Sequence, residues 1–163
     1  MSKLARKPLF LGIAVVLLLT GALSVWVMAF RADLQAAASP NIIYTDAFGI
    51  AIKGYDPVAY FTEHRPVQGN SRYEVIWQDA RWHFANTGHR DLFVTDPERY
   101  APQFGGFCTS YLAKGRMAGA NPEIWAIVDG KLYLKAGKKE ENWINDDMIK
   151  HADEEWAKLQ SKS

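Results

Sequence analysis

The feature that most constrains this chain is an uncharged, apolar run at residues 9–30. At about 1.5 Å per helical residue, the run is long enough to span the roughly 30 Å hydrocarbon core of a bilayer. Lys3, Arg6 and Lys7 precede it, and basic residues favour the cytoplasmic side of a membrane. The sequence therefore predicts a cytoplasmic N-terminus at residues 1–8 and a single transmembrane helix at residues 9–30.

A cleaved signal peptide is the alternative interpretation of this run. Signal peptides usually carry an apolar stretch of only about 7–15 residues, but small residues at 27–29 and 36–38 offer cleavage positions. Under both interpretations residues 31–40 form a linker. Residues 41–163 then form a domain on the periplasmic, extracytoplasmic side of the inner membrane. The formal net charge of +1 lacks the basic excess typical of nucleic-acid-binding proteins, so no nucleic-acid partner is expected.

Local patterns in residues 41–163 predict an α+β fold with one small antiparallel sheet, short helices and a C-terminal amphipathic helix. The Asp129-Gly130 dipeptide suits a two-residue type I′ hairpin turn, and residues 78–81 are expected to link an earlier hairpin. Apolar and alternating segments predict strands at residues 50–52, 73–77, 82–84, 123–128 and 131–134.

Helix starts are marked by capping residues. Asp precedes Pro at residues 56–57 and again at 96–97, and Asp-Pro suits a helix N-terminus. The same reasoning predicts short helices at residues 56–61, 87–95, 96–100 and 108–114. The C-terminal helix is predicted from apolar residues that recur at every fourth position, namely Ile144, Met148, Ala152 and Trp156, with Leu159 continuing the stripe.

Three segments resemble one family. They read GYDPVAYF at residues 54–61, DPERYAPQFGGFC at residues 96–108 and PEIWAIVDGKLYL at residues 122–134. Together they are similar to bacterial membrane-associated proteins of the YHS-domain family, in the same order and over nearly all of residues 41–163. The resemblance implies a metal-binding function, because copper and other metals have been proposed as ligands of related YHS domains, commonly around two cysteines. Here Cys108 matches the first cysteine, whereas Tyr111 and Leu112 stand where a second would be sought.

Cys108 is the only thiol of the chain. At a helix N-terminus its thiolate would be favoured, as a metal ligand or as a nucleophile. The alternative is a small buried apolar residue that follows Gly105 and Gly106. A copper or zinc site would combine Cys108 with the thioether of Met117, with Met148 as a second choice.

His83 and His89 are the imidazoles proposed to complete this metal site, although no CxxC, HxxxH or HxH spacing is present. Along the strand predicted at residues 82–84, His83 points away from Trp82 and Phe84, so it is expected to be exposed if those rings are buried.

Three functions follow from these residues. The first, which we favour, is a membrane-anchored binding module that holds copper, zinc or a small cofactor near Cys108. The second is a structural or protein-interaction domain without a metal site. The third is a thiol-dependent enzyme, which would need a base within hydrogen-bond reach of the Cys108 sulfur. Binding is expected in preference to catalysis.

Overall fold

A computed structural model of the chain describes residues 42–162. The predicted cytoplasmic segment, transmembrane helix and linker, residues 1–40, lie outside the described residues. No helix found within residues 42–162 combines the length and the apolar character needed to cross a bilayer.

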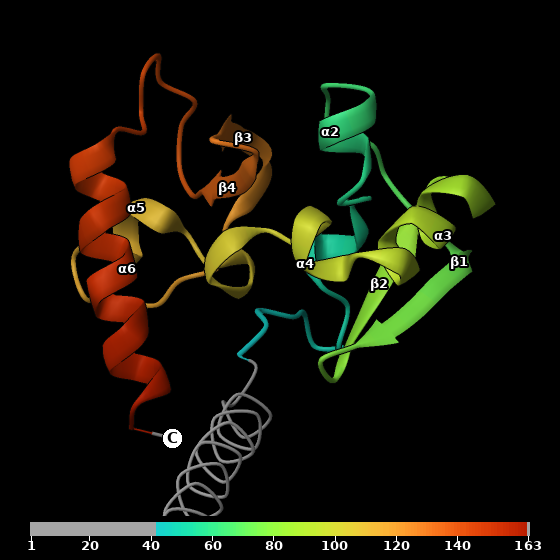
Figure 1. Cartoon of the computed structure of the whole chain (residues 1–163), viewed down its shortest axis with the longest axis horizontal. Helices are drawn as coiled ribbons and strands as arrows, with labels where there is room; N and C mark the ends of the chain where they lie inside the picture. The colour runs from blue at the N-terminus through green and yellow to red at the C-terminus, as the bar shows by residue number, and fades with distance from the viewer. Residues whose placement is uncertain (1–41, 163) are drawn as a thin grey trace, which may run out of the picture. The chain divides into compact units, whose positions relative to one another are not determined.

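Two antiparallel hairpins supply the strands of the described residues (Figure 1). β1 (Asn70–Trp77) pairs with β2 (Ala80–Phe84), and β3 (Asn121–Val128) pairs with β4 (Lys131–Lys135). Both predicted hairpins are confirmed. The turn between β3 and β4 has positive φ at both of its residues, as a type I′ turn requires.

The turn between β1 and β2 differs from its prediction. It consists of Gln78 and Asp79 alone, with φ values of 52° and 58°, rather than the expected link of residues 78–81. Neither residue has the conformational freedom of glycine, so each is held in a sparsely populated backbone region. The tight turn fixes the direction in which the Gln78 side chain leaves the hairpin.

The predicted fold class, a transmembrane helix followed by one small antiparallel sheet, is corrected by this arrangement. The described residues form an α+β fold with two separate two-stranded sheets. The outer edge of β2 is already occupied, since the Ala51 N–H donates to the Arg81 carbonyl (2.9 Å) and the Arg81 N–H donates to the Gly49 carbonyl (2.8 Å). The second hairpin therefore cannot extend the first sheet across this edge.

The predicted strand at residues 50–52 is wrong. Ile50 and Ala51 form only isolated bridges, and the chain then turns into the short 3₁₀ helix η1 (Ile52–Gly54). Positive φ values of 41° at Ile52 and 55° at Lys53 end the extended conformation. η1 contacts both β2 and β3, so it lies between the two hairpins.

Asp96 caps a helix as predicted, Asn86 is the cap of the helix predicted at residues 87–95, and Asn145 is a cap that was not predicted. The helices predicted at residues 56–61 and 108–114 are shorter, at Ala59–Thr62 and Thr109–Leu112. The side chains of Asn86, Asp96 and Asn145 accept hydrogen bonds from backbone N–H groups of the first helical turns. Ile144 precedes the last helix instead of lying within it, because Asn145 is the cap. The elements are α2 (Ala59–Thr62), α3 (Thr87–Thr95), α4 (Pro97–Tyr100), η2 (Gln103–Gly106), α5 (Thr109–Leu112) and α6 (Asp146–Gln160).

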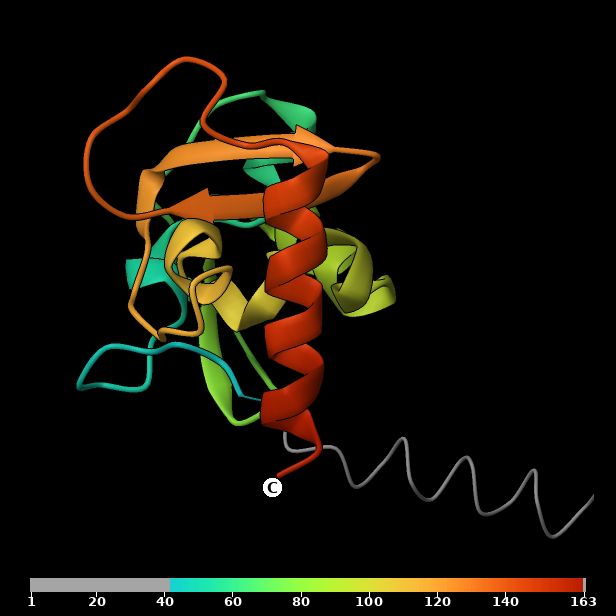
Figure 2. The same ribbon diagram turned by 90° about the vertical axis from the view of Figure 1, so that its left-hand side faces the viewer.

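The buried apolar side chains form two clusters. The larger one is centred on Trp82, Phe84 and Phe93, between the β1–β2 hairpin and α3. The smaller one includes Phe104 and Tyr133 and lies beneath α6, which crosses the β3–β4 hairpin in Figure 2. The segment from α4 to η2 connects the two clusters along the chain.

Tyr44, near the start of the described residues, packs against η2 and the residues that follow it. The Tyr44 N–H donates to the Gly105 carbonyl (2.8 Å), and the Tyr44 ring packs edge-on against Phe107 (5.3 Å between centroids). Gly119 leaves room for the same ring, because a Cβ there would lie 2.1 Å from the Tyr44 Cζ. The chain thus enters the described fold alongside η2.

Replacing Gly105 with alanine should destabilise the protein more than replacing Gly130 with alanine. Both glycines have positive φ, so both substitutions cost about 1 kcal/mol of backbone strain. A Cβ at Gly105 would also lie 1.9 Å from the Ile42 carbonyl oxygen, whereas a Cβ at Gly130 meets nothing within 4 Å. Urea unfolding of the two variants checks this expectation. Equal losses of stability would show that the Ile42 segment does not pack on Gly105 in solution.

Candidate functional site

Cys108 is fully buried within the larger apolar cluster. Its sulfur accepts a hydrogen bond from the Ala136 N–H (3.1 Å) and lies 3.3 Å from the Ser110 hydroxyl. No imidazole is among the hydrogen-bond partners of this sulfur within residues 42–162. The residue is the N-cap of α5, close to the predicted helix start, but its side chain is sealed inside the fold. A thiol enzyme would need a base at this sulfur, and none of residues 42–162 places one within hydrogen-bond reach of it.

The residues predicted to share a metal with Cys108 are not gathered around it. Met117 is exposed, at 43%, while His83 and His89 each contact a carboxylate instead. Within the part of the chain that the structure describes, no group of three or more His, Cys, Asp or Glu side chains could hold a metal ion. The geometry therefore offers no support for copper or zinc at Cys108.

His83 is nearly buried, at 9% exposure, so its predicted exposure is wrong. Its Nε2 lies 2.9 Å from a Glu74 carboxylate oxygen that also accepts from the Arg81 guanidinium (3.0 Å). These hydrogen bonds, led by that of Arg81, lower the pKa of Glu74. The segment before β1 packs closely against His83, which explains its burial. This contact needs glycine at position 69, because a Cβ there would lie 2.6 Å from the His83 carbonyl carbon.

His89 belongs to a chain of hydrogen bonds that begins at the fully buried Asp56. Its Nδ1 lies 2.7 Å from the Asp56 Oδ2, and its Nε2 lies 3.2 Å from the Thr62 hydroxyl. An ionised carboxylate only accepts, so a hydrogen bond to it requires the tautomer with the proton on Nδ1. The order Asp–His–Thr is that of a hydrolytic triad, but the Thr62 hydroxyl donates its single proton to the Val58 carbonyl one turn earlier (3.1 Å), so that proton is not available to the His89 Nε2. That second bond fixes the hydroxyl against the backbone of α2.

The Asp56 carboxylate organises three parts of the chain. Its Oδ1 accepts from the N–H groups of Val58 (2.9 Å) and Ala59 (3.3 Å), which caps the start of α2. Its Oδ2 accepts from the Ala85 N–H (2.8 Å) and from His89. The carboxylate thereby joins α2, the end of β2 and α3, which is a structural role.

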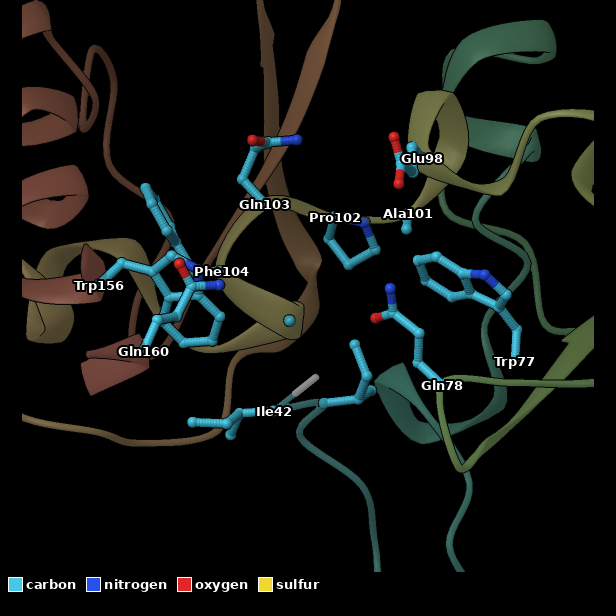
Figure 3. Close-up of a pocket in the computed structure, with 12 residues that line it drawn as sticks. Ile42, Trp77, Gln78, Glu98, Ala101, Pro102, Gln103, Phe104, Trp156 and Gln160 are labelled. Carbon is cyan, nitrogen blue, oxygen red and sulfur yellow. The ribbon is translucent and has the colours of Figure 1, made fainter. Parts of the chain in front are cut away.

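A pocket of about 260 Å³ lies where the two buried clusters meet (Figure 3). One side is formed by Trp77 and Gln78 at the end of the β1–β2 hairpin, and the other by Trp156 and Gln160 on α6. Pro102 lies between these two sides in Figure 3. We name this hollow the Trp77–Trp156 pocket.

Aromatic packing holds the two tryptophans that define the pocket. Trp77 packs perpendicular to Phe93 (5.6 Å between centroids), and Trp156 packs edge-on against Phe104 (6.0 Å). Both indoles are only partly buried. Neither indole N–H forms a hydrogen bond with another described residue. Each tryptophan therefore has one side fixed in the fold and further surface facing the pocket.

Polar groups that line the pocket are also without protein partners. Across residues 42–162, no hydrogen bond is formed by the side-chain amides of Gln78, Gln103 and Gln160, all of which line the hollow. Figure 3 shows the Gln78 amide directed toward Pro102. An amide supplies both donors and an acceptor, so the pocket can bond a polar ligand as well as cover apolar surface.

Two residues that line the pocket have a strained backbone. Phe104 has a φ of 56° and Gln78 a φ of 52°, which cost on the order of 1–3 kcal/mol each for non-glycine residues. Both residues line the pocket.

Comparison of the chain with protein-family models, curated proteins and solved structures finds no match. The resemblance to the YHS-domain family therefore stays a prediction.

Sequence reasoning named Cys108, Met117, His83 and His89 and missed the pocket. Its lining comes from segments far apart in the sequence, and tryptophan or glutamine at such positions carries no spacing signal. The one available local signal was the turn after Trp77, where glycine is absent from a tight hairpin turn.

In the folded protein, Cys108 should react with Ellman's reagent at least about 100-fold more slowly than in denaturant, because the sulfur is reached only when the fold opens. A Met117→Cys variant, made together with Cys108→Ser, provides the control, since residue 117 is exposed and should react quickly. Fast reaction of native Cys108 would contradict its burial.

Asp56→Asn should destabilise the protein by about 3 kcal/mol. The new amide group would place N–H donors against the Ala85 N–H and His89, leaving buried donors without acceptors. Asp96→Asn is the matched control, because that exposed side chain only caps α4 and asparagine caps equally well. Chemical unfolding of both variants measures the difference, and similar losses would show that the Asp56 hydrogen bonds do not organise the fold.

Proposed function

We propose that the protein is a binding module that holds a small ligand in the Trp77–Trp156 pocket. The proposal keeps the class of function expected from the sequence and moves its site from Cys108 to the junction of the two buried clusters. The observation that carries it is a preformed hollow of about 260 Å³ whose amides and indole N–H groups have no partners in the described residues.

The size and lining of the pocket support a small molecule as the ligand. Ligand pockets combine apolar and aromatic walls with a few polar groups that fix orientation, and drug-sized ligands occupy about 300–1,000 Å³. The volume here lies just below that range, so it suits a compact ligand. Pro102 and Phe104 are buried parts of the lining, which gives the pocket a rigid inner surface.

Binding is tested on the full chain by following its tryptophan indole N–H signals in ¹H–¹⁵N spectra. Choline, 3,3-dimethylbutan-1-ol, glucose and acetate serve as probes of different charge and polarity. At least one probe at millimolar concentration should shift the Trp77 and Trp156 signals while leaving that of Trp125, which packs on Tyr60 outside the pocket lining, unchanged. If no probe moves either signal, the proposal fails.

Trp156→Ala and Gln160→Ala should each weaken the binding detected in this way, because each removes part of one side of the pocket. Trp143→Ala is the matched control, since Trp143 packs against the same cluster as Trp156 without lining the pocket. Gln160 is exposed on the last turn of α6, so its variant should fold normally. If Gln160→Ala and Trp156→Ala both fold and both bind the probe as tightly as the unchanged protein, the ligand binds elsewhere.

A further inference from the structure

The charged groups among the described lining of the Trp77–Trp156 pocket are all negative. Glu98 is the carboxylate that lines it, and no lysine, arginine or histidine stands among the described lining residues. Glu98 is exposed, and it forms no salt bridge with any residue in the range 42–162. The pocket therefore presents a negative charge that the described residues leave unbalanced, and the remaining polar lining consists of neutral amides.

The aromatic walls favour the same sign of ligand charge. The face of an indole carries the negative part of the ring quadrupole, and tryptophan is the best of the aromatic side chains at attracting a cation. Two tryptophans and the ring of Phe104 line this hollow. Figure 3 shows Glu98 on the same side as Trp77, with Trp156 and Phe104 on the other side. A cation placed between these sides would have aromatic residues on both sides of it and a carboxylate in the same lining.

From this arrangement we infer that the ligand of the pocket is a small organic cation of the alkylammonium type; the inference rests on the proposed function. An alkylammonium group combines a positive charge with apolar methyl or methylene groups. The alkylammonium group can therefore interact with both the carboxylate and the aromatic walls. A metal ion has no apolar surface for these walls, and an anion would be repelled by the carboxylate. A hydroxyl or similar polar group on the same ligand would bond to the glutamine amides.

Choline and 3,3-dimethylbutan-1-ol test the charge directly, because the two molecules have nearly the same shape and only choline is positive. In titrations of the full chain, followed by the Trp77 and Trp156 indole signals, choline should bind about five- to thirty-fold more tightly than the neutral alcohol. Equal binding, or tighter binding of the alcohol, would overturn the cation inference.

Variants of Glu98 test the contribution of the carboxylate. Glu98→Gln should weaken choline binding several-fold and leave the alcohol unaffected, and Glu98→Lys should weaken choline binding further. Glu141→Gln is the control, because it removes the same charge from an exposed residue outside the pocket lining. The preference for choline should also fall as salt is added, since an exposed charge is screened. If Glu98→Gln binds choline as tightly as the unchanged protein does, the carboxylate has no part and the inference fails.

The failure of this inference can be told apart from the failure of the proposed function. If glucose or the neutral alcohol shifts both indole signals and choline does not, the pocket binds a neutral ligand and only the cation inference is lost. If none of the probes shifts either signal, both proposals are lost together.

Discussion

The described fold depends on one buried carboxylate. Asp56 is fully buried, and backbone N–H groups of α2 and of the chain after β2, together with the His89 ring, donate to its two oxygens. A carboxylate in this environment is stable only while all of these donors are in place. Its hydrogen bonds therefore fix the positions of α2, the end of β2 and α3 against one another, and Trp82 and Phe93 pack within that frame.

Local signals in the sequence predicted much of the secondary structure. The caps at Asn86 and Asp96 and the turn at Asp129-Gly130 depend on neighbouring residues, so the sequence alone reveals them. The division into two sheets depends on residues 49–51 occupying the edge of β2, which is a contact with Arg81 some thirty positions away. The same limit applies to His83, whose surroundings depend on Gly69 lying over the hairpin.

The candidate site shows the limit of sequence reasoning more sharply. The single cysteine and the histidines were the residues with recognisable chemistry, yet their polar atoms are bonded within the fold. The Cys108 sulfur accepts from a backbone N–H, and the His89 ring is hydrogen-bonded to the Asp56 carboxylate. The side chains that remain available to a ligand are tryptophans and glutamines at the junction of the two clusters. Such residues have no characteristic spacing, and only the folded chain, in which α6 and the β1–β2 hairpin line opposite sides of the pocket, brings them to one place.

The attachment of Tyr44 has a mechanical consequence. Because its N–H bonds Gly105 and its ring is seated on Gly119, tension applied to the chain ahead of residue 42 acts first on η2. That short helix carries Phe104, which lines the Trp77–Trp156 pocket. A pull on this end of the protein would therefore act directly on the segment that carries part of the pocket lining.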